Sequence, residues 1–562
     1  MAQSKEAEIL DLRRQWQALR NSSSTWRSHW GEIRDYMLPY HGSGLTGDSR
    51  EPRGGKNTSK IISNAAGFAI RTLASGLHGG LTSPARPWLR LGFEDPALEQ
   101  SEENRQWLFE FADVLLGICA RSNLYSSLHA LYEEIPGFGT GAMLIEDDED
   151  KYARAYTFTT GEYELSVGPT GEVDSLWRKI WMTARQIIDS FGIGVVSEAI
   201  KQAYRRPDDV TTFPIIHVIR PRRMWGIESP LPDKFAYESL YFEEGGTPVQ
   251  FLRQAGYRVR PFVAPRWDVI GTDIYGRSPG MLVLPDVKQL QRMESDKLLG
   301  LAKTVTPPMR GDASVKTNGV SVIPGGITFV PNASAVWEPA YQINFPFQEI
   351  TVETDRVTRR INTVFFVDLF LSIMYEDKRM TAREVVERHD EKLLLLGPTL
   401  ERLHHELLDP LVDRLIDIAA DRGLMPEPPP EVEGQPLKVE YISLLAQAQK
   451  LVGVNAIQQI AGFVGYIAGA YPDALDRFNA DQAVEEYAKL IGVPPNLIRS
   501  DDIVEELRAR RQQQQQAAAL MDNAAPLAQG AKNLSEIDPT KNSALKTVLQ
   551  GAVGASQAGT DV

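Results

Sequence analysis

The chain is 562 residues long, which is too long for one ordinary hydrophobic core and predicts three or four structural units. With 43% hydrophobic and 24% charged residues, its composition is that of a soluble globular protein and excludes a fibrous or wholly disordered chain. The net charge of −14 argues against a protein that coats DNA by neutralising phosphates. It allows a conduit for DNA, because an acidic wall repels the polyanion at short range and lets it slide.

The single cysteine, Cys119, follows the apolar run 109–118 and has no partner for an intrachain disulfide. This usage fits a reducing compartment, and we expect a buried, inert thiol. Residues 1–8 are polar and charged and lack the apolar stretch of a signal peptide. We therefore expect a protein that stays in the cytoplasm unless it leaves inside a particle.

Helical periodicity dominates the N-terminal part. Apolar residues recur at steps of three and four over residues 4–38, with a polar restart at 22–25, and this pattern predicts an amphipathic helical hairpin. Residues 41–60 form a polar, glycine-rich loop, and residues 61–82 return to a helical pattern rich in small residues.

From about residue 140 to 280 the pattern changes to alternation with many aromatic residues, which predicts a β-rich α+β unit. A helix is expected at 286–303, opened by Pro285 and Asp286. Residues 305–345 carry repeated turn signals between short apolar runs, so we expect short strands there.

Helical spacing resumes at 347–371 and, after a polar interruption, continues from 382 to about 422. Pro398 and Pro410 should kink the second helix, because each removes an intrahelical donor and clashes with the preceding turn.

The C-terminal part begins with a stiff proline-rich linker at 425–430. Residues 438–510 are expected to be helical and are followed by a glutamine run. The last forty or so residues lack apolar periodicity, so we expect them to be disordered or ordered only by a partner.

Two glycine-rich stretches superficially match nucleotide-binding motifs. Residues 137–142 fit G-x-G-x-x-A, but a helix precedes them and a strand follows, whereas a phosphate site needs strand, loop and then helix. We expect a tight turn into a strand. In 54–57, Asn57 stands where a Ser or Thr must reach magnesium, so we expect a solvated loop.

The candidate metal-binding motifs are also incomplete. His404 and His405 come near a zinc-protease helix, but Asp409 occupies the position four after His405, so we expect helix-surface histidines. The acidic run 146–150 lacks the ligand spacing and the glycine of a calcium loop, and we expect a solvated turn. We predict no catalytic residues, no metal and no cofactor.

The stretch 451–471 carries no charge and contains Gly465-x-x-x-Gly469, so it meets the length of a membrane span. Asn455 and two glutamines lie inside it, and charged helices flank it. We expect a tightly packed buried helix pair rather than a membrane span.

Three stretches resemble the head-to-tail connector (portal) family of short-tailed DNA bacteriophages. They are GLHGGLTSPARPWLRL at 76–91, YGRSPGM through LPDVK at 275–288, and MTAREV at 380–385 continuing to DPL at 409–411. The similarity extends from about residue 10 to 510 and leaves the C-terminal tail outside. Arg383 is a small departure from the usual pattern, to which we attach no functional meaning.

The resemblance implies an α+β, mainly helical subunit with a wing, two stem helices, a clip, a crown and a tunnel loop, assembled as a ring. The elements predicted from periodicity come in the matching order. We expect a wing at 1–285, stem helices at 286–304 and 347–371, a clip at 305–346, a tunnel loop at 372–381, a long kinked wing helix at 382–425, a crown at 426–516 and a flexible tail at 517–562.

The function implied by the resemblance is that of a dodecameric channel at one capsid vertex, through which terminase packages double-stranded DNA and from which the genome is later ejected. Its implied partners are other copies of the chain, the DNA, terminase, the major capsid and scaffolding proteins and a tail adaptor. The implied location is the head-tail vertex of the virion, without enzymatic activity or stable membrane insertion. Two other readings remain open: a DNA-packaging enzyme of the terminase type (ATPase or nuclease), and a membrane-inserted ejection protein.

The resemblance also directs attention to the charged segment that separates two helical stretches. We expect Tyr375, Lys378 and Arg379 to contact DNA in the tunnel loop, through phosphate contacts that are weak in water and sensitive to salt. The alternative is a solvated turn in which Glu376 and Asp377 offset both cations.

Trp337 lies among polar neighbours in the expected clip. We expect it to contact terminase and then the adaptor, because aromatic anchors often dominate such interfaces. Packing into a small core of the clip itself is an equal alternative.

Overall fold

The computed structural model describes most of the chain, and it divides the chain into two compact units, one comprising 1–96 and 107–492 and the other 97–106 and 493–562. The protein is mainly helical with antiparallel sheets, which confirms the expected α+β class. The described residues are 2–46, 58–206, 208, 210–222, 235–247, 249–310, 338–339, 346–374, 395–442, 457–469, 471, 473, 477–491, 503–504 and 506–516.

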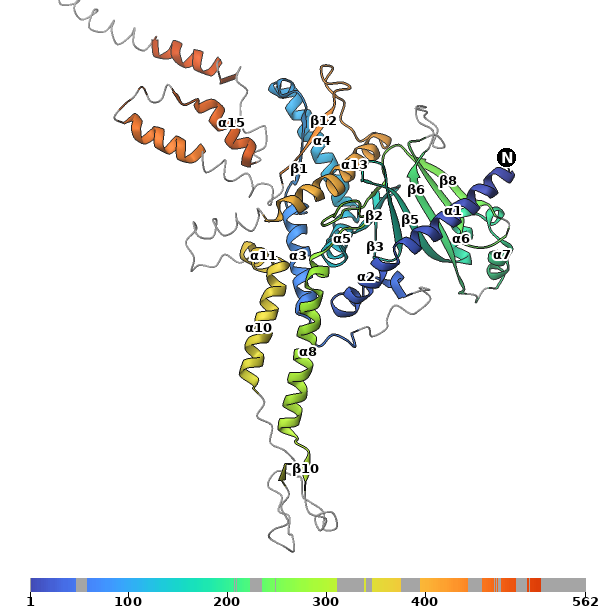
Figure 1. Ribbon diagram of the computed structural model, residues 1–562. Coiled ribbons are helices and arrows are strands. Elements are labelled where there is room, and N and C mark those ends of the chain that lie inside the picture. Colours follow the sequence, from blue (N-terminus) through green and yellow to red (C-terminus); the bar gives the residue numbers. More distant parts are fainter. Residues whose placement is uncertain are drawn as a thin grey trace, which may run out of the picture. The chain divides into compact units, whose positions relative to one another are not determined.

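The expected β-rich unit is present as a five-stranded antiparallel sheet in which each strand pairs with the next one along the chain (Figure 1). Antiparallel strands in this order can be joined directly, without crossover connections, although the connection between β5 and β6 contains two helices. The strands are β4 (Tyr163–Val167), β5 (Val173–Thr183), β6 (Thr212–Pro221), β7 (Tyr237–Glu243) and β8 (Phe251–Tyr257).

Alternating side chains of β6 face opposite sides of this sheet. Ile216 and Val218 lie in the apolar cluster under helix α1 (Ala2–Ser22), whereas Ile215 lies in the cluster under α6 (Ala184–Phe191) and α7 (Glu198–Tyr204). The sheet is therefore covered by helices on both faces. The side chains that α1 contributes are Ile9, Leu12 and Trp16.

The expected helical hairpin at the N-terminus is wrong. Helix α2 (Ser24–Tyr36) follows α1 after the single residue Ser23, whose φ of −82° and ψ of 1° lie near helical values. The Ser23 amide donates to the carbonyl of Leu19, and its own carbonyl accepts from Arg27. One nearly helical residue cannot reverse the chain, so α2 continues past the end of α1 (Figure 1).

Residues 137–142 form the tight turn expected from the sequence. Helix α5 (Leu124–Phe138) ends at Gly139, which has a φ of +89°, and strand β2 (Ala142–Asp148) follows. A Cβ at Gly139 would also overlap the carbonyl of Gly276, so two constraints require glycine there. Strand β2 is the middle strand of a second sheet, between β3 (Tyr152–Phe158) and β9 (Phe262–Val263).

Helix α8 (Pro279–Val305) starts earlier than the sequence pattern predicted. Ser278 caps it, because its Oγ accepts a hydrogen bond from the amide of Met281 at 2.9 Å. Pro279 occupies a first-turn position where no amide donor is needed, whereas Pro285 lies inside the helix rather than at its start. Helix α10 (Phe347–Val364) lies beside α8 (Figure 1).

The helix expected over 347–371 is broken in two. After α10, Phe366 adopts a φ of +54°, a region that bulky residues rarely occupy, and helix α11 (Val367–Met374) begins. Phe365 and Phe370 on either side of the break are buried. Phe370 lies against helix α3 (Ala65–Leu81), where Gly76 provides the space for its ring.

The second long helix is described from residue 395 and widens into π-helical bonding at His404–Leu408 before α13 (Asp409–Asp421). The amide of Asp409 donates to the carbonyl of His404, five residues back. Pro410 has no amide proton and its ring would crowd a regular α-turn, so the wider turn is the local response to this one of the two prolines that the sequence singled out.

The expectation that residues 438–510 are all helical is wrong at its start. Leu437–Tyr441 forms strand β12, antiparallel to β1 (Leu89–Phe93). Leu437, Val439 and Tyr441 alternate with charged residues, which suits a short strand rather than a helix.

Helical residues beyond the strand occur at 457–468, in α15 (Ala480–Ile491) and at 503–516, apart from the undescribed residue 505. The helix at 457–468 is not the buried one expected, because Phe463 is 62% and Tyr466 86% exposed within the single chain. In the described part of the chain, no helix combines the length and the apolar character needed to cross a membrane.

Gly76→Ala should destabilise the protein, because a Cβ at Gly76 would overlap the ring of Phe370 and displace α11 from α3. Overpacking of this kind costs about 1–3 kcal/mol. Gly79→Ala in the same helix is the matched control, since nothing lies within 4 Å of a Cβ there and alanine is the better helix former by up to about 1 kcal/mol. Thermal unfolding measures both, and a Gly76→Ala variant as stable as Gly79→Ala would show that Phe370 does not need this space.

Candidate functional site

The candidate site is the pair of helices α8 and α10, where the resemblance places the channel-lining stem. The two helices lie against each other, and each has buried apolar side chains, Val287 and Leu290 in α8 and Val357 and Ile361 in α10. Across the edge of this contact, Arg360 Nη2 lies 2.9 Å from Asp286 Oδ1. Because both side chains are partly exposed, this ion pair adds little stability. Its main effect is to fix the position of α10 along α8.

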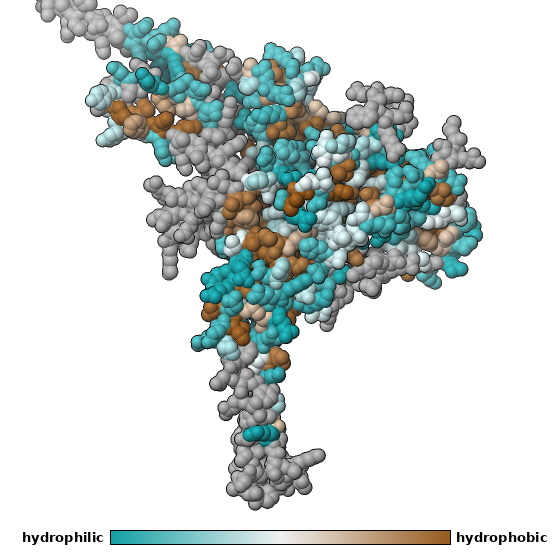
Figure 2. All heavy atoms as spheres, in the orientation of Figure 1, coloured by the Kyte–Doolittle hydropathy of each residue, from teal (hydrophilic) through white to brown (hydrophobic). Residues whose placement is uncertain are grey.

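The stretch of α8 nearer its C-terminus exposes a series of apolar side chains. Leu298 and Leu299 are both 53% exposed, Leu301 is 48% and Val305 71% exposed, and Val352 of α10 is 52% exposed. Figure 2 shows apolar surface interspersed with hydrophilic surface along this pair. Such a run is unusual for the surface of an isolated helix pair and is typical of a surface that another molecule covers.

The charges of the two helices nearly balance. Helix α8 carries four lysines or arginines against three acidic residues, and α10 carries three of each. Several pair along their own helix, as in Arg292 with Asp296 at 2.9 Å and Arg356 with Glu353 at 3.2 Å. The pair therefore differs from the whole chain, whose net charge is −14.

The first turn of α8 is fixed to the end of α5. Ser278 Oγ donates to the carbonyl of Gly137 at 2.7 Å. A Cβ at Gly280 would lie 2.6 Å from the same carbonyl oxygen, so the approach of the two segments requires a glycine. Tyr275 lies edge-on to Trp30 at 4.9 Å and donates its hydroxyl to Glu164 at 2.7 Å.

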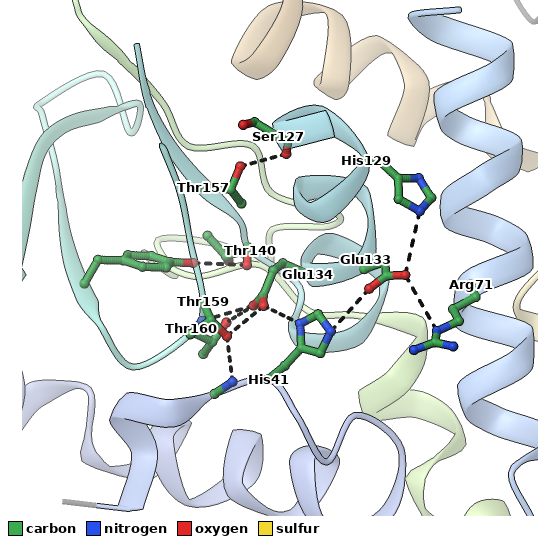
Figure 3. Close-up of polar contacts among 12 residues, drawn as sticks. His41, Arg71, Ser127, His129, Glu133, Glu134, Thr140, Thr157, Thr159 and Thr160 are labelled. Carbon is green, nitrogen blue, oxygen red and sulfur yellow. Dashed lines mark hydrogen bonds and ion pairs between the residues drawn. The ribbon is translucent and has the colours of Figure 1, made fainter. Parts of the chain in front are cut away.

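A cluster of polar side chains around His41 joins the N-terminal region to α5 (Figure 3). His41 lies between two carboxylates, with Nδ1 2.7 Å from Glu134 Oε1 and Nε2 3.2 Å from Glu133 Oε2. Glu134 also accepts hydrogen bonds from Thr159 and Thr160, which follow β3. This cluster therefore ties together the segment after α2, helix α5 and the end of a strand.

The two carboxylates keep His41 protonated. Burial alone would lower the pKa of His41, but hydrogen bonds to Glu133 and Glu134 outweigh it and raise the pKa to about 10. The hydrogen bond from His41 in turn lowers the pKa of Glu133 against the effect of burial. Arg71 of α3 lies 3.8 Å from Glu133 and adds positive charge near it, and His129 Nε2 lies 3.9 Å from the same carboxylate.

The helix that follows the expected tunnel loop is held by a buried ion pair. Arg266, which is 3% exposed, places Nη2 2.7 Å from Glu406 Oε1, and its amide donates to Glu406 Oε2 at 2.9 Å. On the other side of the expected loop, Phe370 rests over Gly76. Both described flanks of that loop are thus anchored to the larger unit.

The predicted contact residues Tyr375, Lys378, Arg379 and Trp337 lie outside the described residues. Of the expected clip, the structure describes the antiparallel pair β10 (Met309–Arg310) and β11 (Glu338–Pro339).

The motifs set aside in the sequence have ordinary structural roles where they are described. His405 is largely exposed and pairs with Asp409 at 3.0 Å, whereas His404 stacks on Tyr441 with ring centroids 5.0 Å apart. Asp148, the middle residue of the acidic run and the last of β2, caps a turn by accepting a hydrogen bond from the amide of Lys151. Residues 54–57 lie outside the described part, within which no three His, Cys, Asp or Glu side chains are placed to hold a metal.

Sequence reasoning missed the cluster around His41 and the pair Arg266–Glu406. Their partners are 93 and 140 positions apart, so no local spacing could reveal them. The one signal available was a charged residue within a stretch that is otherwise apolar, as at Glu133-Glu134.

Comparison with known proteins identifies the family. The chain matches the family model described as "Bacteriophage head to tail connecting protein" over residues 10–498. It is 37% identical to a probable portal protein of Bordetella phage BPP-1, over 99% of this chain and 100% of that protein. It is 36% identical to the portal protein of Salmonella phage epsilon15, over 98% and 100% of the two chains.

The chain therefore belongs to the family of bacteriophage head-to-tail connecting proteins, and its function is that of a portal. This confirms the resemblance, and it favours the portal over the packaging enzyme and the ejection protein. Portal function also gives its location, the head-tail junction of the virion.

Solved structures with similarity include necks of gene transfer agent (GTA) particles. The neck of an empty particle, computed with C6 symmetry, has a TM-score of 0.37 at 13% identity and covers 76% of this chain and 90% of that chain. The neck of a native particle, computed with C12 symmetry, has a TM-score of 0.36 at 12% identity and covers 77% and 91%. This likeness adds nothing to the family assignment.

The cluster around His41 gives stability that depends on pH. The folded-state pKa of about 10 lies above the ordinary value of about 6.5, so the stabilisation is complete below pH about 6.5 and is lost as the pH rises toward 10. His41→Asn should therefore lower the free energy of unfolding by about 3 kcal/mol at pH 6, and the difference from the native protein should shrink by pH 10. His129→Asn is the control, because His129 is 41% exposed and 3.9 Å from Glu133. Thermal unfolding between pH 6 and 10 measures this, and a His41→Asn deficit that does not change with pH would contradict it.

Proposed function

We propose that twelve copies of the chain form a closed ring in which the α8–α10 pairs surround a channel for double-stranded DNA. In this proposal terminase drives the genome inward through the ring, the tail adaptor then binds, and DNA leaves by the same route. The ring itself has no enzymatic activity. The protein is made in the host cytoplasm and joins the capsid and scaffolding proteins at one vertex; the ring number is taken from the family resemblance.

The observation that carries this proposal is the exposed apolar row on α8. Leu298, Leu301 and Val305 lie at steps of three and four, so they share one side of the helix. A neighbouring stem would cover them, and contacts between two different faces close into a ring when the rotation fits. Burial of each side chain from half exposure stabilises the ring by about 1 kcal/mol per contact, repeated at every interface.

The near balance of charge on α8 and α10 suits a channel that DNA must traverse. A strongly basic wall would bind phosphates and hold the DNA, since each lysine or arginine that neutralises a phosphate adds to the affinity. With four cations against three anions on α8, the stem attracts DNA weakly. The ring can then guide the duplex without retaining it.

The division into parts follows the described elements where they exist. We propose that α8 and α10 are the two stem helices, that residues 305–346 are the clip, and that Trp337 in it contacts terminase and the adaptor. Because α8 begins at Pro279, the wing is 1–278 together with the helical residues 395–421; the crown is 426–516 and the tail is 517–562.

Leu298→Glu combined with Leu301→Glu should prevent ring assembly, because the interface would have to bury two carboxylates. Both side chains are about half exposed in the single chain, so the fold of the subunit should remain intact. Size-exclusion chromatography with light scattering measures the assembly. Val210→Glu is the matched control, since Val210 is 82% exposed and lies outside the stem. Rings of unchanged mass in the double variant would show that α8 does not contribute to the interface between subunits.

We propose that Tyr375, Lys378 and Arg379 contact DNA from a tunnel loop. Its flanks are anchored at Phe370 and Glu406, so a dozen copies of the loop would share one constriction. Lys378→Ala combined with Arg379→Ala should leave rings intact and alter the retention of packaged DNA, because salt-sensitive phosphate contacts are lost. Phage particles carrying the double variant, assayed for packaged genome length and for leakage, measure this. Normal packaging, retention and ejection would assign these two residues to a solvated turn.

A further inference from the structure

Strand β8 is one edge of the five-stranded sheet, because β7 is the one strand of this sheet that it pairs with (Figure 1). Alternate residues of an edge strand direct their backbone N–H and C=O groups away from the sheet. In the described part of the chain, no group outside β7 forms a hydrogen bond with the backbone of residues 251–257. The outer edge of β8 therefore leaves backbone donors and acceptors for another extended chain.

The chain closes two other sheet edges with its own side chains. In β3, the side chain of Asn123 donates to the carbonyl of Ala155 and accepts from its amide, both at 2.8 Å. In β4, the amide of Leu165 donates to the hydroxyl of Tyr275 at 3.2 Å. The edge of β8 differs from these two edges, and an edge of this kind is where a second chain can add a strand.

The shape of β8 also permits a close approach. The strand contains no proline, so every residue keeps its amide donor. A bulge interrupts the pairing at Leu252, but residues 253–257 pair regularly with β7. Ala255 and Gly256 lie within this regular stretch, and their small side chains leave room for another backbone beside them.

Two cations flank the regular stretch, one on each face of the sheet. Arg253 is exposed and lies opposite Tyr241, so its side chain is on the face that α6 and α7 cover. Gln254 points to the opposite face, where Lys5 of α1 donates to its Oε1 at 3.0 Å. Among the residues that the structure describes, no carboxylate lies at ion-pair distance from Arg253 or Lys5.

These charges select the partner. Glu238 of the neighbouring strand cannot neutralise them, because it is paired with Arg220 and Arg222 at 2.5 and 3.6 Å. Pairing with β8 of a second copy would bring like charges together, which is unfavourable across strands. An acidic strand is favoured instead. Because successive side chains of a strand point to opposite faces, two consecutive carboxylates can lie near Arg253 and Lys5 at once.

We propose that the outer edge of β8 binds an extended acidic segment of a partner protein, which adds a strand to the sheet. Backbone hydrogen bonds along 253–257 hold the segment, and its two consecutive carboxylates lie near Arg253 and Lys5. The site does not depend on ring formation or on the channel, so it stands or falls separately from the proposed function.

Calorimetric titration of the purified full-length protein with the blocked peptide Thr-Val-Glu-Glu-Val-Thr-Val tests the proposal. The expected result is saturable binding that weakens about tenfold when two glutamines replace the glutamates, since two exposed ion pairs are lost. Backbone methylation tests the strand geometry, because only one edge of a strand faces its neighbour. Methylation of the alternate nitrogens that face β8 should abolish binding, and methylation of the other alternate set should leave it unchanged.

Lys5→Gln combined with Arg253→Gln should weaken binding of the glutamate peptide about tenfold and make the two peptides nearly equivalent. Arg14→Gln combined with Arg185→Gln is the matched control, because it removes two exposed cations from α1 and α6. Arg14 bonds to the carbonyl of Leu10 in its own helix, and Arg185 is 86% exposed. This control variant should bind the glutamate peptide as the native protein does.

Four outcomes would overturn the proposal: no saturable binding, equal binding of the two peptides by the native protein, equal effects of the two methylation patterns, or equal losses in the two double variants. Light scattering during the titration covers one further occupant. A fall in the mass of the assembly as the peptide binds would show that a second copy of the chain occupies this edge, and it would overturn the proposal as well.

Discussion

The contact between the first turn of α8 and the end of α5 is the constraint on which the rest of the structure depends. A helix of 27 residues that exposes several apolar side chains along its far half needs a rigid base. Ser278 provides it by capping α8 with one hydrogen bond while donating another to the carbonyl of Gly137. Glycines at 139, 276 and 280 let the two backbones meet, and any larger side chain at Gly139 or Gly280 would separate them.

Other buried polar groups extend this base in two directions. The His41 cluster ties the segment after α2 to α5, and Arg266 ties the helix after the expected tunnel loop to the segment that follows β9. Charged groups that are largely buried are costly unless they are paired and hydrogen-bonded, and both clusters meet that condition. They add directional contacts where apolar packing alone would permit sliding. In a ring, this rigid base would fix the position of each α8–α10 pair relative to the pair of the neighbouring subunit.

The order and kind of most elements were predictable from the sequence because they depend on local periodicity. The break at Phe366 was not, since a positive φ at phenylalanine exists only because buried contacts of Phe365 and Phe370 enforce it. Strand β12 was missed because its alternation covers only five residues beside a proline-rich linker. Helix α8 was predicted to begin too late, because Pro285 was interpreted as a first-turn proline when Pro279 has that role. The sequence predicted that the site is a pair of helices. It did not predict the polar contacts that hold these helices and their neighbours in place, because those contacts join residues far apart in the chain.

The central proposal is that another copy of the chain covers the exposed apolar side chains of α8. Electron microscopy of the purified native protein, without nucleotide or metal and combined with light scattering, tests this most directly. The account predicts closed rings with a central channel bordered by α8 and α10, and a mass near a dozen chains. A stable monomer of 62.6 kDa under native conditions would contradict it.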